Sequence, residues 1–193
     1  QEEQEYRHIC DLCRRCGLHP PMENANHFSG DFGTFRLRWE RHAEFTTYTF
    51  LRRNKGDEPF AKTACSEVPE KWLRELPGLL LTAIKAEILD KGQPRPNETE
   101  LNKYFVSESL VSSMIGSNGA QRWTDMRIDK DGYIRSLIYD HDMSPRKAGR
   151  VLLRIFEIAV YRNMSLLALP LAREVSVKIA LINSELSALV ARL

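Results

Sequence analysis

The sequence predicts an α+β fold, in which an antiparallel sheet with flanking helices is followed by a long, kinked C-terminal helix of coiled-coil type. Two observations favour this fold. Several short segments alternate apolar and polar residues and are bounded by turn signals such as GSNG and DKDG, as strands are. After Ser144 the pattern changes to helical spacing and continues to the last residue. We therefore expect a head domain at 1–142 and a helical stalk at 143–193, which is truncated here.

The first part of the chain predicts one short helix, two strands and a helical turn. Residues 2–16 place apolar side chains and cysteines on one helical face, and Gly17 ends the helix. Residues 35–40 alternate Phe, Leu and Trp with charged residues, and 45–51 continue with threonines and aromatics. Because the second strand is apolar or neutral on both sides, we expect it to be central in its sheet. A helical turn is expected at 68–73.

The middle of the chain predicts four more strands around a capped helix. The segment 79–89 is read as a strand, and Asn97 is suited to cap a helix at 98–105. The remaining strands are expected at 110–115, 120–128 and 133–139.

The C-terminal region contains the clearest periodicity of the chain. Asp142 or Ser144 is expected to cap the helix, and Pro145 suits its first turn. Apolar residues then step alternately by four and three, which is a heptad seam; they are Ala168, Ala172, Val175, Ile179, Ile182, Leu186, Leu189 and Leu193. Pro170 should kink or split the helix. Five seam residues are the oligomerisation candidates: Val175, Ile179, Ile182, Leu186 and Leu189.

Composition excludes some classes of partner. The net charge is +2, from 28 Lys and Arg against 26 Asp and Glu, so no global attraction to nucleic acid exists and none is expected as a partner. The most apolar segment, VLLRIFEIAVYRNMSLLALPLA, carries three charges, which argue against a membrane span.

The motif CxxCxxC at Cys10, Cys13 and Cys16 has two interpretations. Thiolates at this spacing can bind zinc or an iron–sulfur cluster. Alternatively, the cysteines line the buried side of a helix as small hydrophobic residues. Three positions along one helix do not converge easily on one ion, so we expect no metal and no cofactor. Unpaired cysteines favour a reducing compartment.

Six residues are ligand-binding candidates: Arg36, Arg38, His42, Glu44, Asp125 and Arg127. The first two share a strand face and can hold a phosphate or carboxylate, although this face can equally be a solvated one. His42 and Glu44 can form an acid–base pair at the turn that follows. The last two lie on one side of the strand expected at 120–128, as a structural ion pair or a ligand clamp.

A basic stripe begins the long helix. Arg146, Arg150 and Arg154 recur every four residues near its N-terminus, where the helix dipole disfavours cations. We take them as candidates for contact with an anionic partner.

Five blocks of sequence resemble a known family. They are HFSGDFGTFRLRWERHAEFTTYTF, ELPG, RWTDMRIDKDGYIRSLIYD, SPRKAGR and YRNMSLLALPLARE. Their order resembles the uncharacterised family called domain of unknown function 3422, which comprises predicted membrane-anchored proteins. The resemblance spans His27 to Glu174 and implies a longer natural protein, with hydrophobic segments beyond this chain that reach the membrane. It implies no activity.

Together these features lead to one hypothesis and one alternative. The first is a soluble interaction and assembly module of a membrane-anchored protein, forming a homo-oligomer through its C-terminal helix, with the soluble part in a reducing compartment such as the cytoplasm. The alternative is a domain that binds a small anionic ligand, or is an enzyme, through its arginine-rich strand face. Whether the protein is an enzyme stays open at this stage.

Overall fold

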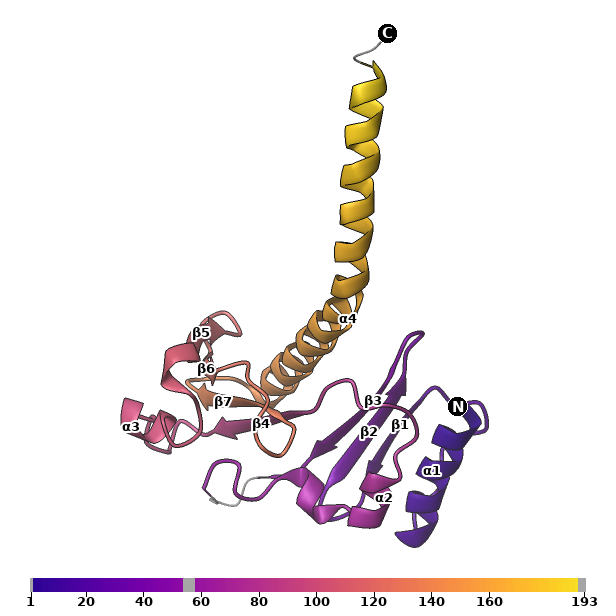
Figure 1. Ribbon diagram of the computed structural model, residues 1–193. Helices are drawn as coiled ribbons and strands as arrows, with labels where there is room; N and C mark the ends of the chain where they lie inside the picture. The colour runs from indigo at the N-terminus through magenta and orange to yellow at the C-terminus, as the bar shows by residue number, and fades with distance from the viewer. Residues whose placement is uncertain (1, 54–57, 191–193) are drawn as a thin grey trace. The chain divides into compact units, whose positions relative to one another are not determined.

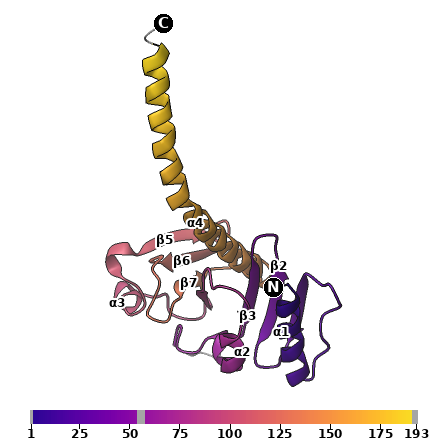
Figure 2. The ribbon, with the colours of Figure 1, turned by 45° about the vertical axis from the view of Figure 1, so that its right-hand side comes forward.

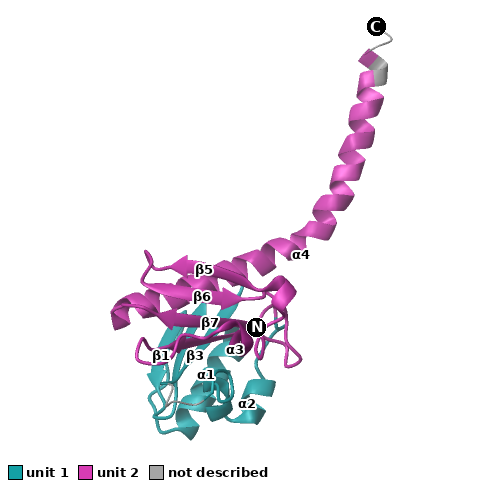
Figure 3. Cartoon of the chain, turned by 90° about the vertical axis from the view of Figure 1, so that its left-hand side faces the viewer, with its two compact units in different colours: residues 1–80 teal, residues 81–193 magenta. Residues whose placement is uncertain are grey.

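The structure is a computed structural model that describes residues 2–53 and 58–190, without the side chains of residues 188 and 189. The chain forms two compact units, residues 1–80 and 81–193, which Figure 3 shows in teal and magenta. Both units combine helices with a sheet, so the predicted α+β class is confirmed. The domain boundary expected at 142/143 stays a prediction.

Unit 1 is a three-stranded antiparallel sheet with helices (Figure 1). Its elements are α1 (Glu2–Arg15), β1 (His27–Asp31), β2 (Arg36–Arg41), β3 (Thr46–Leu51), a 3-10 helix (Ala64–Glu67) and α2 (Glu70–Arg74). The strand order is β1-β2-β3, so the expectation that 45–51 forms a central strand is wrong. The unpredicted strand β1 covers the other edge of β2, and its sequence HFSGD escapes notice because Gly, Asp and Ser are poor strand formers. β3 is an edge strand, and its polar side chains include threonines but no charged residue.

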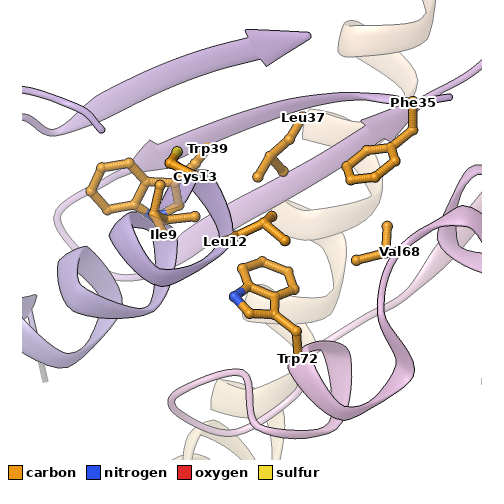
Figure 4. Close-up of a cluster of buried hydrophobic side chains, with 8 residues drawn as sticks. All are labelled: Ile9, Leu12, Cys13, Phe35, Leu37, Trp39, Val68 and Trp72. Atoms are coloured by element: carbon orange, nitrogen blue, oxygen red, sulfur yellow. The ribbon is translucent and has the colours of Figure 1, made fainter. Parts of the chain in front are cut away.

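The alternation of β2 decides where the core of unit 1 lies. Leu37 and Trp39 are fully buried, whereas Arg36 and Arg38, which alternate with them, point to the other face. Figure 4 shows the cluster that forms around them from α1, β2 and the α2 region; its members are Ile9, Leu12, Cys13, Phe35, Leu37, Trp39, Val68 and Trp72.

His8 of α1 and Trp72 of α2 form hydrogen bonds and a ring contact that hold the two helices together. His8 Nε2 lies 2.9 Å from the carbonyl oxygen of Trp72, and Trp72 Nε1 donates to the carbonyl oxygen of His8 at 2.9 Å. The two rings stack with centroids 4.3 Å apart. The imidazole Nε2 and the indole Nε1 are therefore both hydrogen-bonded although they are shielded from water.

Unit 2 contains a mixed four-stranded sheet. Its elements are β4 (Ile84–Leu89), α3 (Glu98–Leu101), a 3-10 helix (Ser107–Ser109), β5 (Val111–Ile115), β6 (Ala120–Thr124), β7 (Ile134–Asp140) and α4 (Pro145–Val190). The order is β4-β7-β6-β5, in which β5, β6 and β7 form the expected antiparallel meander. β4 joins β7 in parallel, because the chain crosses over through α3 before it enters β5.

Local signals explain where the elements of unit 2 begin and end. Asn97 forms a capping box with Glu100, as its position predicted, although α3 ends at Leu101. The strand expected at 120–128 stops at Thr124, because the backbone turns at Met126, whose φ is 55°.

Helix α4 has two parts with different surroundings. Ser144 caps it, and its first part lies along the sheet of unit 2 (Figure 2). Residues such as Val151 and Ile155 pack there against Ala120 and Ile138. From residue 165 onward every described side chain is exposed. The helix bends in its middle (Figure 1) but remains continuous through Pro170, so the predicted kink does not split it. Among the described residues, no helix is long and apolar enough to cross a membrane.

Candidate functional site

The arginines of the predicted strand face both have carboxylate partners. Arg36 Nη2 donates to Asp31 Oδ2 at 3.1 Å, and Arg38 Nη2 donates to Glu40 Oε1 at 2.6 Å. The N–H of Gly33 and the guanidinium of Arg36 hold the pKa of Asp31 below its usual value. An anionic ligand on this face has to displace two intramolecular carboxylates. The geometry is that of a solvated sheet face carrying ion pairs.

His42 and Glu44 occupy the β2–β3 turn, and both are exposed. The backbone N–H of His42 donates to Phe45 at 2.8 Å, which closes the turn, and the imidazole ring lies 4.5 Å from the Phe45 ring. Within the described parts of the chain, the imidazole and the Glu44 carboxylate form no hydrogen bond with one another. The turn therefore shows no preformed acid–base pair.

Asp125 and Arg127 belong to unit 2 and hold a loop in place. The Asp125 carboxylate accepts the N–H of Val106 and the N–H of Arg127, each at 3.1 Å. Arg127 Nε donates to Ser109 Oγ at 2.8 Å. Because β6 ends before them, the two side chains do not form the side-by-side pair expected from a continuous strand. They tie the end of β6 to the 3-10 helix before β5.

The cysteines follow the buried face of α1. Cys10 is 7% exposed and Cys13 is 0% exposed, whereas Cys16 is exposed and all three are free thiols. Burial raises the pKa of Cys13 to about 11. In the described residues, no three His, Cys, Asp or Glu side chains lie close enough together to hold a metal ion. Cys13 is packed in the hydrophobic core.

The basic stripe of α4 lies on the exposed side of that helix. Arg146, Arg150 and Arg154 are all exposed. None of them forms a hydrogen bond or ion pair with a residue that the structure describes. The stripe is available to a partner, and its role stays a prediction.

The heptad seam is the most exposed apolar feature of α4. Four of its residues have exposed fractions of 43–61%: Val175, Ile179, Ile182 and Leu186. The side chain of Leu189, and Leu193 altogether, lie outside the described residues. Neighbouring apolar side chains are exposed as well, among them Leu171, Val177 and Leu181.

Sequence reasoning missed two clusters of charge that lie inside the fold. Glu5 is 3% exposed and binds Arg41 and Thr46 between α1 and the sheet of unit 1. In unit 2, Arg122 of β6 lies near Arg162 of α4, under the packed part of the helix. The sequence signal for them is the periodicity of the apolar residues. Each charged residue occupies a position of its helix or strand at which that periodicity predicts an apolar side chain.

Comparison with known proteins identifies one family. The family DUF3422, described as a protein of unknown function, matches residues 1–193. No curated protein and no solved structure matches the chain.

Proposed function

We propose that this chain, which belongs to the DUF3422 family of proteins of unknown function, is an assembly module that self-associates through the distal half of α4. The observation that carries the proposal is the seam of four apolar residues, each at least 43% exposed, at heptad spacing. An exposed apolar stripe of this length favours aggregation unless another surface covers it.

A second copy of the same helix is the occupant that fits the seam. In heptad notation Ile179 and Leu186 are a positions, and Val175 and Ile182 are d positions. An antiparallel pairing places a against d, so Ile179 meets Ile182 of the second copy and Val175 meets Leu186. Each layer then combines side chains of comparable total volume, which helps both helices to stay in contact along the seam.

Charge favours the antiparallel orientation. Lys178 and Glu185 both stand directly before an a position, which is the g position beside the seam. In the antiparallel pairing Lys178 lies opposite Glu185 of the second copy, and the pair occurs twice. In a parallel pairing Lys178 would face Asn183, and Glu185 would face Val190, which gives no ion pair.

The expected affinity follows from the exposed area. Burying four half-exposed seam residues on each of two helices gains roughly 6–12 kcal/mol, at about half of 1.5–3 kcal/mol for a full side chain. This gain is similar to the association cost of about 4–15 kcal/mol. At the favourable ends of the two ranges about 8 kcal/mol remains, which corresponds to a dissociation constant on the order of micromolar, and we expect the dimer to be no tighter than this.

Anchoring at a membrane completes the proposal. The family resemblance supports hydrophobic segments elsewhere in the natural protein, and tethering raises the effective concentration of a weakly associating module. The free thiols, including the exposed Cys16, support a head that faces a reducing compartment.

Sedimentation velocity at 1–100 µM tests the dimer. We expect Ile182→Asp to yield monomers, whereas Leu181→Asp stays dimeric, since both side chains are 61% exposed but only the first lies in the seam. A wild-type monomer at 100 µM with full helix content by circular dichroism would refute self-association, as would equal dissociation of both variants.

Charge reversal tests the orientation. Lys178→Glu places two carboxylates opposite one another in the antiparallel dimer and should weaken it several-fold. Adding Glu185→Lys should restore the affinity. A parallel dimer would respond to neither change.

A further inference from the structure

Two arginines of unit 2 lie near one another on the packed face of the sheet, and neither has a carboxylate partner among the described residues. Arg122 lies opposite Ile138 in the β6–β7 register, on the same face as Ala120, and both of these residues contact α4. Its Nε and Nη2 donate to the hydroxyl of Ser136, at 3.2 and 3.0 Å. Ser136 is fully buried, so its hydroxyl holds one edge of the guanidinium against the sheet. The Nη1 group of Arg122 forms no hydrogen bond with any described residue.

Arg162 approaches from α4, two turns after the buried Ile155 and on the same helical face. Its Nη1 lies 2.7 Å from the sulfur of Met126, a weak acceptor that carries no charge. Its Nε is buried and has no hydrogen-bond partner among the described residues. Met126 is 43% exposed, so the pair borders solvent on that side.

Partial burial without a carboxylate partner among the described residues distinguishes this pair from the exposed arginines of the α4 stripe. Arg36, Arg38, Arg41 and Arg135 each pair with a carboxylate, whereas neither Arg122 nor Arg162 does so with any described residue. Burial, and then the positive charge of Arg162, lower the pKa of Arg122. Two adjacent cations that are partly removed from water repel one another, and each retains N–H groups without an acceptor.

We propose that Arg122 and Arg162 bind a phosphate group at the junction of β6 and α4. Guanidinium groups present their N–H donors in a fork that matches phosphate oxygens. The Nη1 of Arg122 and the Nε and Nη2 of Arg162, which form no hydrogen bond with a described residue, are donors that remain for it. A phosphate dianion neutralises both cations, whereas a single carboxylate would leave one positive charge.

The phosphate can belong to a small soluble molecule or to a lipid headgroup, and both present the same chemistry to the two arginines. Neither source depends on the proposed dimer, since the seam of α4 begins after Arg162. Failure of one proposal therefore leaves the other standing.

Thermal unfolding of the full chain with sodium phosphate tests the site, against sodium chloride at equal ionic strength. We expect phosphate at 10–20 mM to raise the Tm of the wild type by about 2–4 °C more than chloride does. Arg122→Met and Arg162→Met, tested singly, should each abolish this difference. Arg173→Met, which removes an exposed arginine from the same helix, should retain it.

A second readout separates anion binding from a purely structural role. Without phosphate, Arg162→Met should unfold at the same temperature as the wild type or higher, because it removes an uncompensated charge whose only described hydrogen-bond partner is the sulfur of Met126. A structural arginine would lose stability on substitution. Arg122→Met is the less direct comparison, because it also removes the donors of the buried Ser136 hydroxyl.

Vesicle sedimentation identifies the source of the phosphate. Vesicles containing phosphatidic acid that retain the wild type and Arg173→Met, but release Arg122→Met, would assign the site to a lipid headgroup. Phosphate stabilisation without vesicle binding would assign it to a soluble phosphate compound. The proposal is overturned if the wild type shows neither response, or if both responses survive in Arg122→Met and in Arg162→Met.

Discussion

The buried carboxylate of Glu5 should contribute strongly to the stability of unit 1. Its side chain is 4% exposed and accepts hydrogen bonds from Arg41 Nε at 3.3 Å and from Thr46 Oγ1 at 2.9 Å. Removing one partner of a buried ion pair costs about 3–5 kcal/mol, because the remaining charge stays buried. Arg41 is 16% exposed and also contacts Glu2, so Glu5→Gln should cost less, about 2–3 kcal/mol.

Glu2 provides a matched control for this prediction. Its carboxylate lies 3.6 Å from the same guanidinium, but the side chain is 82% exposed. Glu2→Gln should therefore change the free energy of unfolding by less than about 0.5 kcal/mol. Urea unfolding can be followed by fluorescence in a Trp123→Phe background, where Trp39 and Trp72 both report unit 1. Equal losses in the two variants would show that burial does not set the strength of this pair.

Three further predictions concern burial. Leu137→Ala, at a fully buried position, should destabilise unit 2 by about 2–5 kcal/mol in urea unfolding, whereas Leu79→Ala, at 92% exposure, should stay within about 0.5 kcal/mol. Burial lowers the pKa of His8 from 6.5, so its stabilising contribution is complete above pH 6.5 and is lost as the pH falls through the folded pKa; Tm measured from pH 7.5 to 5 should fall less in His8→Gln. A thiol reagent at pH 8 should modify Cys16 rapidly and Cys13 only on unfolding, and mass spectrometry of modified peptides should reveal this order.

The sequence predicts those elements of this fold whose signals are local. The alternation of β2, the cap at Asn97 and the helix start at Ser144 are each decided by a few neighbouring residues, and all are found. Strand order is different, because it depends on which segments meet. β1 has weak strand propensity and gains its hydrogen bonds from β2, while β4 reaches β7 only through a long connection.

The candidate ligand residues show the same division. Alternation placed Arg36 and Arg38 on one face correctly, but their carboxylate partners, Asp31 and Glu40, depend on side-chain geometry. The apolar pattern predicts a strand that includes Asp125 and Arg127, but the strand ends before them, because the left-handed backbone at Met126 leaves no mark in that pattern.

The two halves of α4 explain why one proposal could be reached from sequence and the other could not. The seam between Val175 and Leu186 repeats every seven residues within a single segment, so periodicity alone reveals it, and the structure adds only that the seam is exposed. The arginine pair requires β6 and the first half of α4 to lie together, and neither segment indicates the other. Within its own segment Arg122 lies between Ala120 and Thr124, which are both buried on the same strand face. Only the packed structure shows that Arg162 lies near it, and that no carboxylate of the described chain pairs with either arginine.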